Sequence, residues 1–233
     1  MPAAQPPNWL PPIDGLQRID PDHRYQLHGQ QFRISVTGVL SCLKTPFAMD
    51  RINATRHVWA PRGHETHRAI ELFLSQQFGA ELQALLEGDH RDWIQPLLCS
   101  DRWGAVQVIA SERPTCCSRR GVAGTFDLAY QDPGLPPPER PRWACKGPAR
   151  VLADLKTLGE NGATYSTAAQ LGGYMALEAT HGNWYDYGQT IWARPGSTTW
   201  SPLYSRQQCL IAWAAAWACF RAIGDDPNPL RGL

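Results

Sequence analysis

Two acidic residues and a lysine in apolar surroundings could support metal-dependent chemistry. In VLADLKT (151–157), Asp154 and Lys156 alternate with apolar residues and would share one face of a strand. Asp127 lies in GTFDLA (124–129), the apolar segment that precedes it. If these strands are neighbours, two carboxylates and an ammonium meet, and the repulsion between the carboxylates favours Mg²⁺, or Mn²⁺ as its substitute. Such a metal could activate water against a phosphodiester, with Lys156 orienting that water, helping to deprotonate it, or stabilising the pentacovalent phosphorus.

Two other residues could contribute to the same site. Glu112 follows an apolar, strand-like segment and could supply a third carboxylate, or it could be a solvated strand end. His67 lies in the predicted helix GHETHRAIE. It could ligate the metal, hydrogen-bond to a residue that ligates the metal, or be a helix histidine with a purely structural role. The Asp154–Lys156 pair also has a simpler interpretation as an ion pair at a sheet edge.

Length and composition limit the class of protein. The 233 residues are 43% hydrophobic and 18% charged, as expected for one globular core with at most a small appendage. A formal net charge of +1 gives no general positive field, so any nucleic-acid contact must come from a local patch. No apolar run approaches the roughly 18 residues that a membrane span requires. The Pro-rich N-terminus does not resemble a signal peptide, so we expect a cytoplasmic protein.

The seven cysteines are expected to be reduced. An odd number cannot pair completely, and the sequence contains no C-x-x-C pair. We therefore expect neither a disulfide framework nor an iron–sulfur cluster.

Hydrophobic periodicity and turn residues divide the chain into a Pro-rich arm and one domain. Residues 1–24 predict an irregular arm, and residues 25–233 predict the domain, with a Pro-rich insert at 131–147. The domain opens with a short hairpin that turns at His28-Gly29. The other expected elements are helices over 39–43, 46–57, 63–78, 81–88 and 90–98, strands over 105–112, 120–130 and 151–157, a helix over 167–180, strands over 187–195 and 197–204, and a helix over 205–223. This order predicts a mixed α/β layer fold.

Five segments of the chain resemble, in order, the motifs of the PD-(D/E)XK nuclease superfamily. The likeness is greater to its RecB-like exonuclease branch, which includes the mitochondrial genome maintenance exonuclease and phage and bacterial relatives. The acidic residue before x-K is Asp154 rather than Glu, which the family accepts, and the insert at 131–147 is a departure that could change how DNA enters. The matching segments are ISVTGVLSCLKTP (34–46), RGHETHRAIE (62–71), SE with GTFDLA (111–112 and 124–129), LADLKT (152–157) and QLGGYMAL (170–177).

The resemblance implies a fold, an activity and a set of site residues. The fold would be a restriction-endonuclease-like core, with a central mixed β-sheet flanked by helices in the order αβββαβ. The activity would be Mg²⁺-dependent hydrolysis of DNA by an exonuclease, at single-stranded ends or flaps, in repair, replication or recombination. The implied metal ligands are Asp127, Asp154, the backbone carbonyl of Leu155, Glu112 and His67. The implied catalytic residues are these four side chains with Lys156, Gln170 and Tyr174, of which Gln170 and Tyr174 would approach the DNA and the lysine.

DNA contacts are expected from short basic and aromatic stretches. One is RPTCCSRR (113–120), predicted to form a hairpin tip, and another is ERPRWACKGPAR (139–150). Basic loops are also common simply because they are solvated. The residues expected to contact DNA are Arg113, Arg119, Arg120, Arg142, Trp143, Lys146, Arg150 and Tyr165.

Two other functions remain open. The chain could be a non-catalytic nucleic-acid-binding protein on a nuclease fold, but Asp127, Asp154 and Lys156 are all present, and loss of function usually removes such residues. It could also be a nuclease of the CRISPR-adaptation type, which would require four cysteines around an iron–sulfur cluster. The cysteine spacing argues against that type.

Overall fold

The fold is seen in a computed structural model that describes residues 9–19, 24–136, 138–142, 144 and 146–223. A seven-stranded sheet has the strand order β10-β8-β7-β6-β4, with β5 pairing with β6 and β9 with β8. The β4–β6 and β7–β8 pairs are parallel and the others antiparallel, so the sheet is mixed. Its strands are β4 (Ile34–Ser35), β5 (Gln107–Cys117), β6 (Val122–Asp132), β7 (Ala149–Thr157), β8 (Tyr187–Arg194), β9 (Ser197–Trp200) and β10 (Tyr204–Ser205).

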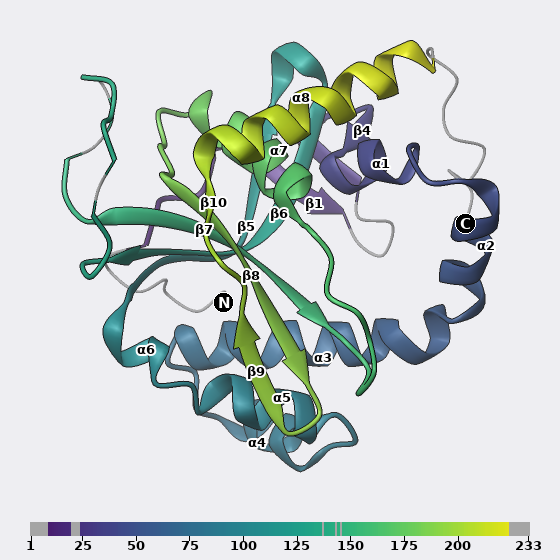
Figure 1. Ribbon diagram of the computed structural model, residues 1–233, viewed down its shortest axis with the longest axis vertical. Coiled ribbons are helices and arrows are strands. Elements are labelled where there is room, and N and C mark those ends of the chain that lie inside the picture. The colour runs from purple at the N-terminus through teal and green to yellow at the C-terminus, as the bar shows by residue number, and fades with distance from the viewer. Residues whose placement is uncertain (1–8, 20–23, 137, 143, 145, 224–233) are drawn as a thin grey trace.

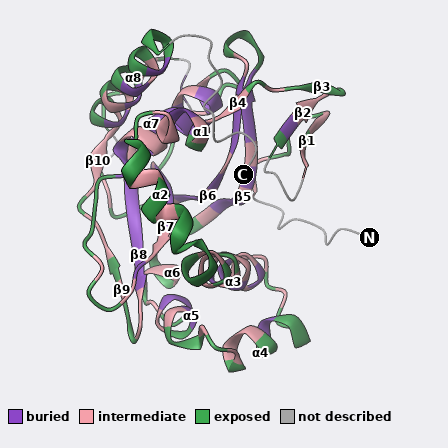
Figure 2. Ribbon diagram, turned by 90° about the vertical axis from the view of Figure 1, so that its right-hand side faces the viewer, coloured by how far each residue is buried: buried purple, intermediate pink, exposed green. Residues whose placement is uncertain are grey.

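Helices cover both faces of this sheet (Figure 1). Figure 2 shows α1, α7 and α8 on one side and α3, α4 and α5 on the other. Each side has its own apolar core: Leu152 packs under α7 and α8, whereas Val151 and Ala153 pack with α3 and α5. This division follows from the alternation of side chains along β7. The helices are α1 (Val36–Ser41), α2 (Pro46–Ala54), α3 (Arg56–Leu74), α4 (Ala80–Glu87), α5 (Arg91–Leu98), α6 (Arg102–Ala105), α7 (Ala168–Ala179) and α8 (Arg206–Ala222).

The predicted mixed α/β fold and its central element order are confirmed. Taken in chain order, and with α4, α5 and α6 between the first two, the elements α3, β5, β6, β7, α7 and β8 give the order αβββαβ. Some bounds differ from the expectation: the helix predicted over 46–57 ends at Ala54, and α3 begins at Arg56 and ends at Leu74. Of the helices in the described residues, none is both long and apolar enough to span a bilayer.

The prediction that residues 1–24 are irregular is wrong for β1 (Leu16–Ile19). This strand pairs antiparallel with β2 (Arg24–Leu27), which also pairs with β3 (Gln30–Gln31), so the three form a small second sheet. Four residues carry too little periodicity to indicate a strand, and β1 is completed by its partner. The turn predicted at His28-Gly29 is confirmed, because both residues have positive φ, 49° and 83°.

Helix α7 lies unusually close to α8 because of its glycine pair. A Cβ atom on Gly172 would lie 2.0 Å from the backbone oxygen of Cys209, so no other residue fits at that crossing. The cost of two glycines in a helix is therefore offset by packing. This close contact fixes α7, and with it Gln170, against the sheet.

The edge of β6 that faces β7 is interrupted at its centre. Along this edge, β4 pairs with Val122 and Ala123, and β7 pairs with residues 128–132. Residues 124–127 therefore have no strand partner on that side among the described residues. The gap places Asp127 where a side chain, rather than a strand, meets the backbone of β7.

Candidate active site

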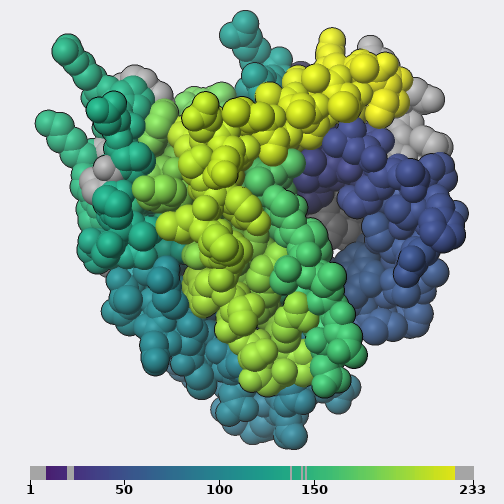
Figure 3. Space-filling model, viewed as in Figure 1, coloured from purple at the N-terminus to yellow at the C-terminus, as the bar shows by residue number. Residues whose placement is uncertain are grey.

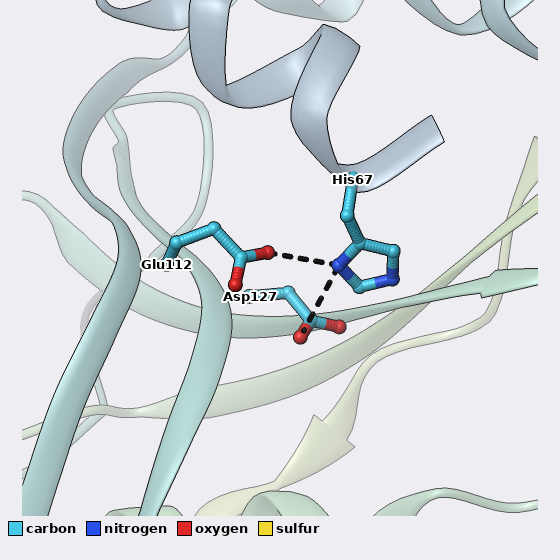
Figure 4. A group of neighbouring side chains, drawn as sticks. All are labelled: His67, Glu112 and Asp127. Atoms are coloured by element: carbon cyan, nitrogen blue, oxygen red, sulfur yellow. Dashed lines mark hydrogen bonds and ion pairs between the residues drawn. The ribbon is translucent and has the colours of Figure 1, made fainter. Parts of the chain in front are cut away.

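Three predicted metal ligands lie together beside this gap (Figure 4). His67 extends from α3, and Glu112 and Asp127 extend from β5 and β6. His67 Nδ1 lies 2.8 Å from Glu112 Oε1 and 3.7 Å from Asp127 Oδ1. One ligand atom of each residue lies within 4.8 Å of the others. The sequence placed these residues on three separate elements, and the fold brings them together.

Glu112 does not end the first strand, as the sequence predicted, but lies in the middle of β5. The flanking pairs Ser111–Leu128 and Arg113–Phe126 place Glu112 directly opposite Asp127. Glu112 also has a positive φ of 44°, in the left-handed region that non-glycine residues rarely adopt. Such local strain often occurs at functional sites, and here it accompanies a carboxylate that reaches His67.

Asp127 links the middle of β6 to β7, the strand that carries Asp154 and Lys156. The backbone N–H of Leu155 donates to Asp127 Oδ2 at 2.7 Å, within the interrupted edge. The carbonyl oxygen of Leu155 lies 3.2 Å from His67 Nε2. Both backbone groups of Leu155, its N–H and its carbonyl, therefore face residues that were predicted to share a metal with it.

Asp154 and Lys156 form a second group, on the side of β7 that faces α7. Lys156 Nζ lies 2.7 Å from Asp154 Oδ2, and Gln170 Nε2 donates to Asp154 Oδ1 at 2.6 Å. The side chain of Asp154 is only 1% exposed and that of Lys156 24% exposed. The carboxylate of this ion pair is buried, and β7 lies between β6 and β8, so the interpretation as an ion pair at a sheet edge is wrong.

The charges of the site shift the pKa values of its members. Burial alone would lower the pKa of His67, but the charge of Asp127 and the hydrogen bond and charge of Glu112 raise it to about 9. Both ring nitrogens face oxygen acceptors, as a doubly protonated imidazolium requires. Burial raises the pKa of Asp127, although the charges of His67 and Lys156 oppose that shift.

The Asp154–Lys156 pair is shifted for the same reasons. Burial raises the pKa of Asp154 to about 6; the charge of Lys156 opposes this shift and that of Asp127 adds to it. Burial would lower the pKa of Lys156, but the charges of Asp154 and Asp127 raise it above its ordinary value. Lys156 is thus an ammonium at neutral pH, suited to stabilising negative charge rather than to accepting a proton.

The donor set fits a hard divalent cation. Two carboxylates, a backbone carbonyl and an imidazole converge, and oxygen donors of this kind are what Mg²⁺ and Mn²⁺ prefer. The His67 imidazolium would have to lose a proton before its nitrogen could ligate a metal. Asp154, which was also predicted to be a ligand, is not part of this group. It lies on the side of β7 that faces α7, where its oxygens contact Lys156 and Gln170.

Both α7 residues lie near the charged groups: Gln170 donates to Asp154, and burial, followed by the charges of Asp127 and Asp154, raises the pKa of the Tyr174 hydroxyl. Tyr174, one turn further along, is 3% exposed and packs near the ring of Phe126. A Cβ atom on Gly124 would lie 2.8 Å from the Tyr174 ring, so that glycine makes room for it. The expectation that Tyr174 approaches DNA is wrong, since its ring is sealed in the core.

The first predicted DNA-contacting stretch divides into a buried and an exposed part. Arg113 is not at the hairpin tip but inside β5, 7% exposed, where it pairs with Glu178 and donates to the carbonyls of Leu10 and Pro11. Its predicted phosphate contact is therefore wrong. Arg119 and Arg120 do form the tip, in a turn that ends at a left-handed glycine. Counting along β6 at about 3.3 Å per residue, this tip lies roughly 16 Å from Asp127.

The second stretch lies at the far end of β7. Arg142 and Lys146 are exposed in the Pro-rich loop, and Arg150 is half-buried at the start of the strand, while Trp143 lies outside the described residues. Ala149 is five positions before Asp154 and seven before Lys156, so at about 3.3 Å per residue the loop ends roughly 16 Å from Asp154 and 23 Å from Lys156. The structure does not bring these residues to the charged groups.

Two basic residues near the site were missed by the sequence analysis. Arg62 Nη2 donates to the carbonyl of Thr157 at 3.3 Å, beside the D-x-K strand. Burial, and then the positive charge of Lys156, lower the pKa of Lys44, which places Lys44 within the electrostatic reach of Lys156. Both residues lie inside the segments that carry the family resemblance, and that position was the only available signal.

Comparisons with known proteins add little to this geometry. No protein-family model matches the chain, and no curated protein matches it. Among solved structures, the chain is similar to one titled "Crystal structure of SSO0001", with 13% sequence identity and a TM-score of 0.32 over 83% of this chain and 77% of that one. This likeness is too low to support an argument about function.

Proposed function

We propose that this protein is a Mg²⁺-dependent deoxyribonuclease of the PD-(D/E)XK type, acting as an exonuclease on single-stranded ends or flaps. The observation that carries the proposal is the position of Asp127 in the interrupted edge of β6. There it accepts a hydrogen bond from the Leu155 backbone and lies beside His67 and Glu112. The last β6–β7 pair joins Leu128 to Ala153, so Asp127 and Asp154 each lie one residue beyond that pair. Five predicted residues from four elements thus converge on one short length of β7.

Each residue has a distinct role in the proposed reaction. Glu112, Asp127 and the Leu155 carbonyl would hold the metal, which supplies a Lewis acid and a nucleophilic water when bound. The Lys156 ammonium would stabilise the negative charge that develops on the phosphoryl oxygens. Gln170, which donates to Asp154 Oδ1, is a positioning residue that holds this carboxylate beside the lysine.

The proposal is tested with end-labelled DNA and one charge-neutralising variant. We expect the full chain to degrade linear single-stranded DNA with Mg²⁺ or Mn²⁺ but not with EDTA, and to spare closed circles. Asp154→Asn should abolish cleavage while DNA binding is retained, because it keeps the shape but removes the charge that holds the Lys156 ammonium in place.

A matched control is Asp132→Asn, which neutralises a buried aspartate on β6 that pairs with Arg102 away from the site. This variant should retain cleavage. Equal turnover by wild type and Asp154→Asn would remove Asp154 from the site. Degradation of circles at the linear rate would contradict the exonuclease assignment while leaving a nuclease.

A further inference from the structure

A hollow of about 400 Å³ opens on the surface formed by β8, β9 and the segment between β7 and α7. Its volume lies in the range of about 300–1,000 Å³ that is typical of small-ligand sites. Its walls are aromatic rings and hydroxyl groups, and the residues that line it, all within the described chain, carry no charge. The main contributors are Tyr165, Ser166, Trp192, Thr199, Trp200 and Tyr204.

The hollow adjoins the strand that carries Lys156. In the parallel β7–β8 pair, Lys156 lies opposite Trp192, which lines the hollow. The ring of Tyr165 packs edge-to-face against Trp192, with centroids 5.1 Å apart. Burial raises the pKa of the Tyr165 hydroxyl, and the charge of Lys156 partly opposes this shift, so the hydroxyl lies within the electrostatic reach of the lysine. A ligand in the hollow would therefore lie beside the lysine.

Tyr165 is exposed but belongs to an anchored segment. Its side chain is 53% exposed. The segment at 158–167 is held at its start, where Trp93 Nε1 donates to the Leu158 carbonyl at 2.7 Å and Arg194 Nη1 to the Gly159 carbonyl at 3.2 Å. Figure 3 shows this segment, drawn in green, at the surface beside the yellow-green atoms of β8 and β9. The ring is thus presented to solvent from a fixed backbone.

This combination suits a nucleobase better than a charged ligand. Bases stack on aromatic rings whatever their identity, and hydroxyl groups can donate to phosphate or base oxygens. No carboxylate in the lining would repel a phosphodiester. A base inside a duplex is paired and stacked on its neighbours, so only a single strand can place one here without the cost of unstacking.

We propose that this hollow binds one base of single-stranded DNA next to the bond to be cut, with Tyr165 as its stacking surface. The inference rests on the proposed nuclease function for the neighbouring bond. It assigns to Tyr165 the role of a binding residue and explains a preference for single-stranded ends.

The experiment measures binding without cleavage. Fluorescence anisotropy with the full chain in EDTA gives the Kd of labelled (dT)8 and of an eight-unit abasic chain with the same phosphates. Tyr165→Ala should weaken (dT)8 binding about 5- to 100-fold, as expected for the loss of one stacked base. Tyr165→Phe should stay within about twofold, since it keeps the ring. The control Phe78→Ala, which removes a 67% exposed ring on the α3–α4 connection, should leave the Kd unchanged.

The abasic chain separates stacking from a general loss of binding. Wild type and Tyr165→Ala should bind it with the same Kd, because it offers no base. The proposal is overturned if wild type does not bind (dT)8 or if Tyr165→Ala binds it normally. It is also overturned if Tyr165→Ala loses as much affinity for the abasic DNA as for (dT)8. Tyr165-dependent binding without Mg²⁺-dependent cleavage would reject the nuclease function alone, whereas cleavage without Tyr165 dependence would reject the base site alone.

Discussion

Two groups of buried carboxylates in this protein differ in how completely they are neutralised. Asp186, 2% exposed at the start of β8, accepts from Arg140 Nε at 2.7 Å, from Trp184 Nε1 at 3.0 Å and from the backbone N–H of Arg150 at 2.8 Å. Asp186 thus joins Arg140 of the Pro-rich loop to Arg150 of β7, and Arg140 also donates to the Gly147 carbonyl within the loop.

The site around β7 has three carboxylates and only two cations, His67 and Lys156, in direct contact with them. The pKa values of Asp127 and Asp154 are raised there, chiefly by burial. A carboxylate surrounded by donors stabilises the fold, whereas an excess of carboxylates leaves a place for a further cation. Burial of a carboxylate alone therefore does not mark a site, whereas incomplete neutralisation of buried carboxylates does.

The largest effect is expected on stability, at Asp186. Asp186→Asn removes the charge that compensates Arg140 and should lower the free energy of unfolding by about 3–5 kcal/mol, as for other broken buried pairs. Urea denaturation measures this change, and Asp50→Asn, an exposed aspartate on α2, serves as control. Turnover per folded molecule should be unchanged. A loss of turnover in the folded variant would mean that the two groups are not separate.

The next effect is expected on turnover, at Lys156. Lys156→Met should reduce the cleavage rate about 10²- to 10³-fold, because it removes a preorganised charged donor. Lys156→Arg should also lose most activity, since a planar guanidinium does not replace a compact ammonium. Lys146→Met, at an exposed lysine far from the site, is the control. A Lys156→Met enzyme within a few-fold of wild type would reduce the D-x-K strand to a structural ion pair.

A smaller effect is expected on the pH dependence of stability in EDTA. The pKa of His67 is raised from 6.5 to about 9, so its contribution is complete below pH 6.5 and is lost as the pH rises through 9. Allowing for partial solvent screening, the free energy of unfolding should fall by about 1–3 kcal/mol across this range. His67→Gln should flatten the decrease. Equal pH profiles for the two proteins would show that His67 is not held as an imidazolium.

The smallest effect is expected at the Pro-rich loop. The double variant Arg142→Gln with Lys146→Gln removes two exposed charges about 23 Å or more from Lys156, a distance estimated from the strand rise. For substrates of a few nucleotides, the salt dependence of binding should not change. If both residues held phosphates, the slope of log Kd against log salt would fall by about 2.

The sequence predicted the parts of the site that depend on local pattern. The alternation of Asp154 and Lys156 with apolar residues required a strand with both charges on one face, and the structure has it. Glu112 and His67 were candidates from their own segments and the family resemblance supported them, but no periodicity could indicate their contact across 45 residues. Arg113 and Tyr174 were assigned to DNA because of their type and motif position, yet both are buried.

Sequence alone thus determined the order of the elements and which face of each strand and helix is apolar, because these follow from side-chain periodicity along the chain. Only the tertiary structure decided that β6 pairs with β4 and then with β7, leaving Asp127 free to accept from the Leu155 backbone between them. It also decided that Lys156 lies beside Trp192. Pairing between strands is set by the packing of the whole sheet, and it is this pairing that turns separate charged residues into a site.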